Sequence, residues 1–299
     1  MSLIQKYVWV IDTLHRTGGL SLKELNSRWV RTDMSRGEPI PRQTFDRWKG
    51  GILDIFGVVI ECNLSDAYRY YIYNPEVLAE GELQRWLLDS FSTANSLSQH
   101  TSLRNRIIVE NIPSSRKYLQ SVINAMAADR VLNITYHSYH SVKEYTFDVE
   151  PYCIRMLCQR WYLLARSVAY DTLRIYALDR IVSLETTDRS FSLPDDFDAK
   201  SYFAPYYGII LEPDTAEQRI VLRAITYHSH YMRSLPLHPS QCEINTTPDY
   251  SDFELHLCPT FDFCLELLHA ADMLEVLEPQ SLRQRMHDLT WCMYHKYIE

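Results

Sequence analysis

Apolar residues recur at helical spacing in three segments near the start of the chain. Residues 3–16 carry them three and four positions apart, and Gly18-Gly19 ends that segment. Ser21-Leu22-Lys23-Glu24 has the form of a capping box, which marks the start of a second helix. Pro41 suits the first turn of a third helix. The predicted inward face of that helix consists of Phe45, Trp48, Ile52, Ile55 and Phe56.

Strand-like runs follow the third helix. Val58–Cys62 and Tyr68–Tyr73 are rich in β-branched and aromatic residues, and the polar stretch Asn63–Ala67 separates them. This pattern predicts a β-hairpin. Three helices and a hairpin in this order are typical of a winged helix-turn-helix, in which the third helix enters the DNA major groove and the hairpin contacts the backbone. We therefore expect residues 1–74 to form a winged helix-turn-helix DNA-binding domain.

The predicted outer face of the third helix carries side chains suited to DNA. Arg and Gln can form paired hydrogen bonds with base edges, and Thr and Lys suit phosphates. The candidate DNA-binding residues are Arg42, Gln43, Thr44, Arg47 and Lys49. Asp46 lies on the same face and Gly50-Gly51 falls within the helix, which both count against DNA contact. Two alternatives therefore stay open: an ordinary polar helix face, and a winged helix that contacts protein.

Residues 75–128 have no strand signal and read as helical. Glu82–Phe91 and Lys117–Ala128 are predicted helices, and the polar stretch Asn95–Ser102 lies between them. Regulators that bind palindromic DNA act as symmetric pairs. We therefore interpret this region as a linker that also contributes to dimerisation. A helical spacer without an interface is the alternative.

Residues 129–202 read mainly as strands. Between Leu173 and Ile181, the residues Arg174, Tyr176, Leu178 and Arg180 alternate with residues of the other parity. Because a strand points alternate residues to opposite faces, two guanidinium groups and a phenol are expected on one side. Such a side can hold an anionic ligand. The alternative is a strand with one solvated face.

Several short motifs in this region occur in the order seen in the WYL domain, which is named for its Trp-Tyr-Leu. They are Ile134-Thr135-Tyr136, Glu150-Pro151-Tyr152, Trp161–Ala165, Leu173-Arg174, Leu178–Ile181 and Phe191. The region therefore resembles a WYL domain, and Pro41–Trp48 resembles part of the helix-turn-helix that accompanies it. The resemblance implies a small Sm-like or SH3-like β-barrel. In that family the barrel senses a ligand, often nucleic acid or a nucleotide, within bacterial transcription regulators.

The candidate ligand-binding residues combine aromatic rings, a hydroxyl and two guanidinium groups. They are Tyr136, Ser138, Tyr162, Arg174 and Arg180. The fixed fork of a guanidinium matches phosphate geometry, and aromatic neighbours can stack on bases. The alternative is that the arginines pair within the chain, for instance with Asp171, Asp179 or Glu185.

The remainder, residues 203–299, begins with a stretch rich in Tyr, Gly and Pro, which indicates a domain boundary. The order of predicted elements is then βαββαβ followed by one more helix. This order is that of a ferredoxin-like sandwich. The position agrees with the C-terminal extension of WYL proteins, which implies a role in closing the sensor pocket or the dimer.

The distribution of charge along the chain bears on the prediction of DNA binding. The whole chain carries 30 Lys and Arg against 38 Asp and Glu, a net charge of −8, which argues against non-specific binding of nucleic acid. Residues 1–74 carry ten basic and eight acidic residues, which gives a net charge of +2. The remainder carries twenty basic and thirty acidic residues, which gives a net charge of −10. A specific DNA-binding unit remains compatible with this, because it needs only a local basic surface.

Motifs of common enzymes and cofactor sites do not occur in the sequence, including the P-loop, GxGxxG, HExxH and GxSxG. The pairs His137/His140 and His228/His230 lack a Cys or carboxylate at matching spacing. The seven cysteines form no CxxC pair, as expected of free thiols in a reducing cytoplasm. No apolar run reaches about 18 residues, and the start lacks the features of a secretory signal. We expect a cytoplasmic protein without enzymatic activity, metal or cofactor.

These patterns favour a bacterial transcription regulator. Its expected partners are double-stranded operator DNA, a nucleotide or nucleic-acid-like effector, and a second copy of the chain. The effector would bind the WYL-like domain and change operator affinity. The alternative is an accessory subunit whose WYL-like domain binds nucleic acid or a partner enzyme, without operator recognition.

Overall fold

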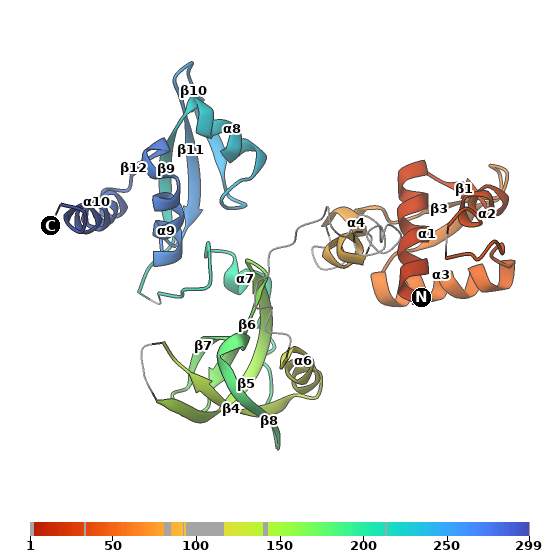
Figure 1. Cartoon of the computed structure of the whole chain (residues 1–299), viewed down its shortest axis with the longest axis horizontal. Coiled ribbons are helices and arrows are strands. Elements are labelled where there is room, and N and C mark those ends of the chain that lie inside the picture. The colour runs from red at the N-terminus through yellow and green to blue at the C-terminus, as the bar shows by residue number, and fades with distance from the viewer. Residues whose placement is uncertain are drawn as a thin grey trace. The chain divides into compact units, whose positions relative to one another are not determined.

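A computed structural model describes residues 3–32, 34–80, 85–91, 93, 117–139, 143–212 and 214–298. The chain divides into two compact units, Met1–Glu110 and Asn111–Glu299. Both contain helices and antiparallel sheets (Figure 1). The predicted mixed α+β class is confirmed at this level.

The first unit contains the three predicted helices and the predicted hairpin in the predicted order, together with β1 and α4, which were not predicted. Its elements are α1 (Leu3–Thr17), β1 (Leu20–Ser21), α2 (Leu22–Trp29), α3 (Arg42–Phe56), β2 (Ile60–Asn63), β3 (Arg69–Ile72) and α4 (Glu76–Glu80). The hairpin β2–β3 is completed by β1, so the sheet order is β1-β3-β2. The predicted capping box starts α2: the Glu24 amide donates to Ser21 Oγ at 3.3 Å, and the Ser21 amide donates to Glu24 Oε2 at 2.8 Å.

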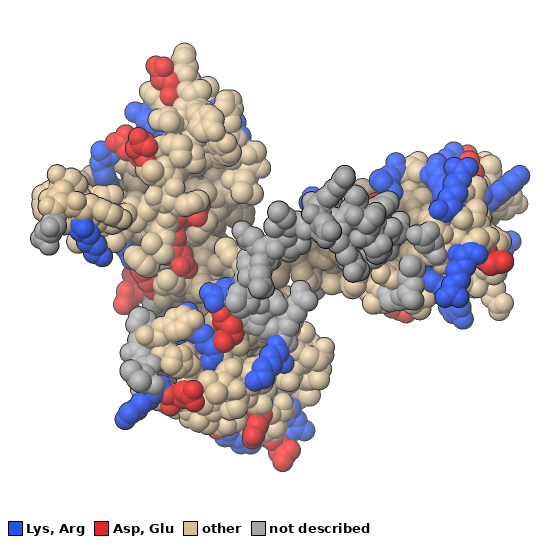
Figure 2. Space-filling model, in the orientation of Figure 1, with Lys and Arg blue, Asp and Glu red and all other residues tan. Residues whose placement is uncertain are grey.

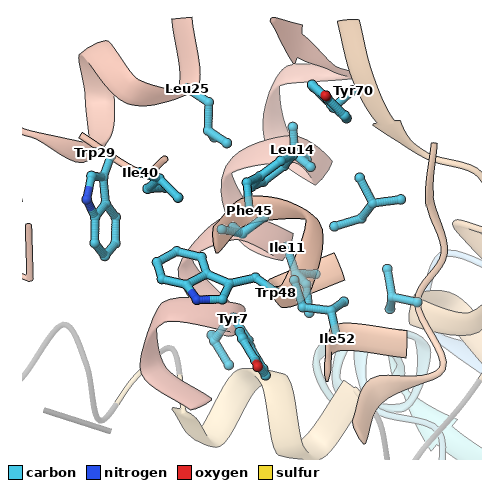
Figure 3. Close-up of a cluster of buried hydrophobic side chains, with 14 of the residues drawn as sticks. Tyr7, Ile11, Leu14, Leu25, Trp29, Ile40, Phe45, Trp48, Ile52 and Tyr70 are labelled. Atoms are coloured by element: carbon cyan, nitrogen blue, oxygen red, sulfur yellow. The ribbon is translucent and has the colours of Figure 1, made fainter. Parts of the chain in front are cut away.

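An aromatic core holds these helices and the sheet together (Figure 3). Trp29 of α2 meets Trp48 of α3 edge to face, with ring centroids 5.5 Å apart, and Phe45 meets Tyr70 of β3 at 4.9 Å. Such edge-to-face pairs add to the stability given by burial alone. One predicted core residue is wrong: Ile55 is 46% exposed. It lies off the buried stripe of α3, whose members are Phe45, Trp48, Ile52 and Phe56.

The second unit begins with α6 packed on a five-stranded antiparallel sheet. The elements are α6 (Leu119–Ala127), β4 (Arg130–His137), β5 (Glu144–Leu157), β6 (Arg160–Ser167), β7 (Thr172–Ala177), the 3-10 helix η2 (Leu178–Arg180) and β8 (Ile181–Ser190). Val122 and Ala125 of α6 are buried in the core of this sheet. The predicted helix Lys117–Ala128 is thus present, and it packs on the sheet; its assignment to a linker that also contributes to dimerisation stays a prediction.

The order of strands in this sheet is β7-β6-β5-β4-β8. Strands β7 and β8 are the two edges and do not pair with each other within the described residues, so a closed barrel is not confirmed. They are nevertheless consecutive in the chain, and only the three residues of η2 join them. The 3-10 helix therefore lies where the two edges of the sheet approach each other.

The last part of the chain forms a four-stranded antiparallel sheet with its own core. Its elements are α7 (Ala199–Phe203), β9 (Gln218–Ile225), α8 (Thr226–Ser234), β10 (Cys242–Thr246), β11 (Tyr250–Leu257), α9 (Phe261–His269), η3 (Ala271–Met273), β12 (Leu274–Glu278) and α10 (Gln280–His295). From β9 onward this is the predicted βαββαβ order with an added helix. The sheet order is β10-β11-β9-β12.

Candidate functional site

The surface of α3 presents three of the five candidate DNA-binding residues to solvent. Arg42, Gln43 and Arg47 are exposed, whereas Thr44 and Lys49 are half-buried. The buried stripe of α3 packs inward and thereby turns these side chains outward. The ion pairs among the described residues of this unit involve other cations, so Arg42 and Arg47 have no carboxylate partner there.

Lys49 differs from these arginines because its charge is already engaged. Its Nζ lies 2.9 Å from Asp46 Oδ1 and 5.3 Å from the centroid of the Tyr70 ring. An ammonium over an aromatic face next to a carboxylate is less available to a phosphate. Lys49 stays a predicted contact, but the geometry favours Arg42 and Arg47 over it.

Other exposed arginines of this unit were not predicted from the sequence as candidate DNA contacts. Arg28, Arg31 and Arg36 are exposed on α2 and the turn after it, again without an ion pair among the described residues. Figure 2 shows Lys and Arg side chains over the visible surface of this unit, with few Asp and Glu between them. Asn26 fixes the approach to α3: its side chain accepts from the Ile40 amide at 2.7 Å and donates to the Ile40 carbonyl at 3.1 Å.

A second group of polar residues surrounds η2 in the five-stranded sheet. We call it the η2 cluster, and its members are Tyr136, Tyr139, Arg160, Tyr162, Asp179 and Arg180. The Arg180 guanidinium carbon lies 3.8 Å from the centroid of the Tyr139 ring. The Tyr136 hydroxyl accepts from the Ala177 amide at 3.2 Å. Arg160 and Asp179 form an ion pair.

The protonation states of the cluster follow from burial and charge. Burial raises the pKa of both Tyr136 and Tyr162, so both phenols stay neutral near pH 7. Burial alone would lower the pKa of Arg160, but the Asp179 carboxylate outweighs this and the pKa is raised. The cluster therefore combines charged guanidinium groups with neutral hydroxyl groups.

Three buried polar atoms of this cluster have no hydrogen-bond partner within the described residues: Arg160 Nε, Asp179 Oδ1 and Arg180 Nε. Buried polar groups in proteins are nearly always hydrogen-bonded, so such atoms call for an explanation. Two of the three are N–H donors on cations. The cluster thus has free capacity to donate hydrogen bonds to an anion.

Arg174 lies apart from this cluster. It is exposed, its guanidinium carbon lies 4.7 Å from the centroid of the Tyr170 ring, and its Nε is 3.4 Å from Thr172 Oγ1. It lines a hollow of about 550 Å³ together with other residues of β7 and with residues of α7 and the stretch after α7, including Tyr202, Tyr206 and Leu211.

The predicted alternation from Arg174 to Arg180 is therefore wrong beyond Ala177. Residues 178–180 turn as a 3-10 helix, and that turn takes Arg180 off the strand face that carries Arg174. Tyr136 and Tyr162 do lie close to Arg180, as predicted. Ser138 is half-buried just beyond β4. Tyr139 and Arg160 were not predicted, because their proximity depends on how distant strands meet, and Asp179 was named only as a possible partner of Arg174 or Arg180.

Under the alternative interpretation, the two arginines pair with Asp171, Asp179 or Glu185. Asp179 pairs with Arg160, Asp171 accepts from Arg166 at 2.7 Å, and Glu185 forms no ion pair among the described residues. Neither Arg174 nor Arg180 forms an ion pair within the part of the chain that the structure describes.

The described residues include no group of three or more His, Cys, Asp and Glu side chains placed to hold a metal ion. None of the described helices has the length and apolar character needed to cross a bilayer.

Comparison with known proteins identifies the domain that contains the η2 cluster. Residues 117–186 match the WYL domain, so the chain contains this domain, as its motifs predicted. No curated protein matches the chain. Among solved structures it is similar to proteasome accessory factor B/C (PafBC) of Arthrobacter aurescens, at 18% identity and a TM-score of 0.36 over 95% of this chain and 45% of that one. It thus spans less than half of that chain.

A second similar structure is described as a CRISPR Cas-related protein, at 12% identity and a TM-score of 0.34. That match covers 93% of this chain and 72% of the other.

Proposed function

We propose that this protein is a cytoplasmic transcription regulator of bacterial type. Residues 1–74 would bind operator DNA as a winged helix-turn-helix. The WYL domain would bind an anionic effector, a nucleotide or a nucleic-acid fragment, and thereby change operator affinity. The observation that carries the proposal is the η2 cluster within the WYL domain, with its unsatisfied buried N–H groups on two arginines.

The support for DNA binding comes from α3. Its exposed Arg42, Gln43 and Arg47 follow the turn that Asn26 fixes. In winged helix-turn-helix proteins the third helix reads the major groove. Arg28, Arg31 and Arg36 add positive charge to the same unit, which favours phosphate contacts. The negative charge of the chain resides outside residues 1–74, which carry a net charge of +2 against −10 for the remainder.

The support for a phosphate-bearing effector is chemical. Guanidinium groups form paired, charge-assisted hydrogen bonds with phosphate oxygens. Tyr139 and Tyr162 lie beside these groups and provide aromatic faces on which a base can stack. We propose Arg160, Arg180 and Tyr136 as the groups that contact the effector, with Asp179 displaced from Arg160 when the anion enters.

The experiment is a pair of binding titrations on the full-length protein. A labelled duplex from the region upstream of its own gene is titrated at several salt concentrations, with and without a short single-stranded oligonucleotide. We expect salt-dependent duplex binding that the oligonucleotide changes. Because linkage is reciprocal, the duplex must change oligonucleotide affinity by the same factor. Absence of duplex binding would refute operator recognition, and an unchanged duplex affinity would refute the sensor role.

A further inference from the structure

A hollow in the last domain of the chain is lined by residues of the helices α8 and α9 (Figure 1). We call it the α8–α9 hollow. Its volume is about 330 Å³, and its lining includes Tyr227, Tyr231, Leu237, Glu266, Met273 and Leu274. Hollows of about 300 Å³ and more hold small organic molecules. A bare metal ion would leave most of this space empty, so the size favours an organic ligand.

One carboxylate without a cation partner faces this hollow. Glu266 is half-buried, and it is the single carboxylate among the described lining residues, which include no Lys or Arg. Arg233 is the one Lys or Arg in the two helices, and it pairs with Glu243 instead. Glu266 forms no ion pair within the described part of the chain. A hydrogen bond from Tyr207 occupies only part of its acceptor capacity, since a carboxylate accepts about four hydrogen bonds.

The histidines of the hollow do not offset this charge. His228 and His269 both contribute to the lining. Burial lowers the pKa of His228 below its ordinary value of 6.5, although the Glu266 carboxylate acts in the opposite direction. The His228 imidazole is therefore neutral near pH 7. His269 is exposed, so water screens its ring from the carboxylate.

The other lining groups are aromatic or apolar. The hydroxyl oxygens of Tyr227 and Tyr231 share a hydrogen bond at 2.9 Å, and their ring centroids are 5.4 Å apart. Aromatic faces attract cations. Leu237, Met273 and Leu274 supply apolar surface. An anion would be repelled by Glu266 and would meet no Lys or Arg among the described lining residues, so the combination suits a cation with an apolar body.

We propose that the α8–α9 hollow binds a small organic ammonium ion that carries an apolar group. Glu266 accepts hydrogen bonds from the ammonium group, and the ring of Tyr231 lies beside the positive charge. Leu237, Met273 and Leu274 contact the apolar group. This site goes beyond the proposed function, because it lies outside residues 117–186 and shares no residue with the η2 cluster.

The first test compares ligands that share one carbon skeleton and differ in charge. Ligand-observed NMR titrations on the full-length protein at pH 7 use 2-phenylethylamine, which is protonated, 2-phenylethanol, which is neutral, and phenylacetate, which is an anion. We expect the amine to bind at least about 10-fold more tightly than the alcohol, the value of a charge-assisted hydrogen bond. We expect phenylacetate to bind most weakly. An amine that binds no better than the alcohol, or that does not bind at millimolar concentration, would overturn the proposal.

The second test locates the amine at Glu266. Glu266→Gln keeps an oxygen that can accept from Tyr207 and removes the charge. It should weaken binding of the amine by about 10-fold or more and leave binding of the alcohol unchanged. Glu217→Gln is the matched control, since Glu217 is an exposed glutamate of the same domain outside the lining. Equal amine affinity in the two variants would overturn the assignment to this hollow.

Discussion

Two arginines of the WYL domain differ in what surrounds their guanidinium groups. Arg180 is half-buried over Tyr139 with an unsatisfied Nε, whereas Arg174 is exposed over Tyr170. A desolvated charge interacts more strongly with an anion than an exposed charge does, since water screens the exposed one. The sequence pattern predicts both arginines on one strand face and gives no reason to prefer either as the contact to the effector. The burial of Arg180 favours it over Arg174 for this contact.

Replacing Arg180 is therefore expected to weaken effector binding selectively. Arg180→Ala should reduce the affinity for a short single-stranded oligonucleotide by about 10- to 100-fold, the value of charge-assisted hydrogen bonds. Arg174→Ala is the matched control and should change it by less than about threefold, in line with an exposed charge. Calorimetric titration of both variants measures this. Equal losses in the two would contradict this preference for Arg180.

Burial also sets the reactivity of the thiols. Burial raises the pKa of Cys153 to about 11, so its reactive thiolate is scarce at pH 8. Cys158, Cys242 and Cys292 are exposed. We expect an alkylating reagent at pH 8 to label these three quickly and Cys153 only after denaturation, as read by peptide mass spectrometry. Fast labelling of Cys153 in the native protein would contradict its burial.

At the scale of elements, neighbouring glycines of α3 have different roles. A Cβ on Gly51 would lie 2.3 Å from the Tyr7 hydroxyl oxygen, whereas a Cβ on Gly50 would meet nothing within 4 Å. Gly51 therefore permits the close approach of α1, and its place inside a helix has a packing reason. The sequence shows the two glycines side by side and offers no way to separate them.

Alanine at each glycine tests this difference. Gly50→Ala is expected to stabilise the protein by up to about 1 kcal/mol, because alanine loses less backbone entropy in a helix. Gly51→Ala is expected to destabilise it by about 1–3 kcal/mol through overpacking against Tyr7. Urea unfolding of both variants gives the two free energies. A stabilising Gly51→Ala would show that Tyr7 moves aside without cost.

The edge strand β10 depends on an ion pair to α8. Glu243 accepts from Arg233 Nη2 at 2.6 Å, and this bond is the main cause that lowers the pKa of Glu243 to about 2. A carboxyl whose pKa is lower in the folded state contributes stability above its unfolded pKa, and that contribution is lost as the pH falls through its folded pKa. The pair should therefore weaken as the pH falls from 4.5, the ordinary pKa of a glutamate side chain, to about 2.

Glu243→Gln is expected to remove this acid-sensitive contribution. The free energy of unfolding of the variant should be lower than that of the wild type by about 1 kcal/mol at pH 6, after allowance for solvent screening. The difference should be smaller at pH 3. Thermal unfolding of wild type and variant at both pH values measures the difference. A loss of the same size at pH 3 and pH 6 would contradict a role for the charge of Glu243.

At the scale of the whole molecule, sequence patterns predict well those structural features that depend only on residues close together in the chain. The helical stripes, the capping box and the β2–β3 hairpin are all local and were found from spacing. The packing of α6 on the sheet and the meeting of Tyr139 with Arg180 depend on residues far apart in the chain. The turn at Leu178–Arg180 escaped prediction, because its residues alternate as a strand does. The domain boundaries after residues 74, 128 and 202 stay predictions.

The proposed operator binding would be a property of the whole molecule, and it is tested on α3. Arg47→Ala is expected to weaken duplex binding. If Arg47 contacts a phosphate, the slope of log affinity against log salt should fall by about one. If Arg47 reads a base, the variant should show a relaxed sequence preference. Arg16→Ala is the control, since Arg16 already pairs with Asp12 at 2.7 Å. Wild-type affinity in the Arg47 variant would remove it from the interface.

The short link between β7 and β8 has a consequence for the shape of the WYL sheet. Five flat strands would hold their outer edges about 19 Å apart, at about 4.8 Å per gap. From Ala177 to Ile181 the chain can span at most about 14 Å. A flat sheet is thus impossible, and the strands must wrap into an arc. Consistent with this, the Tyr136 hydroxyl on β4 reaches the Ala177 amide on β7, although two strands separate them in the sheet. The η2 cluster lies at the gap of that arc, so an anion bound there would act on the curvature of the entire domain.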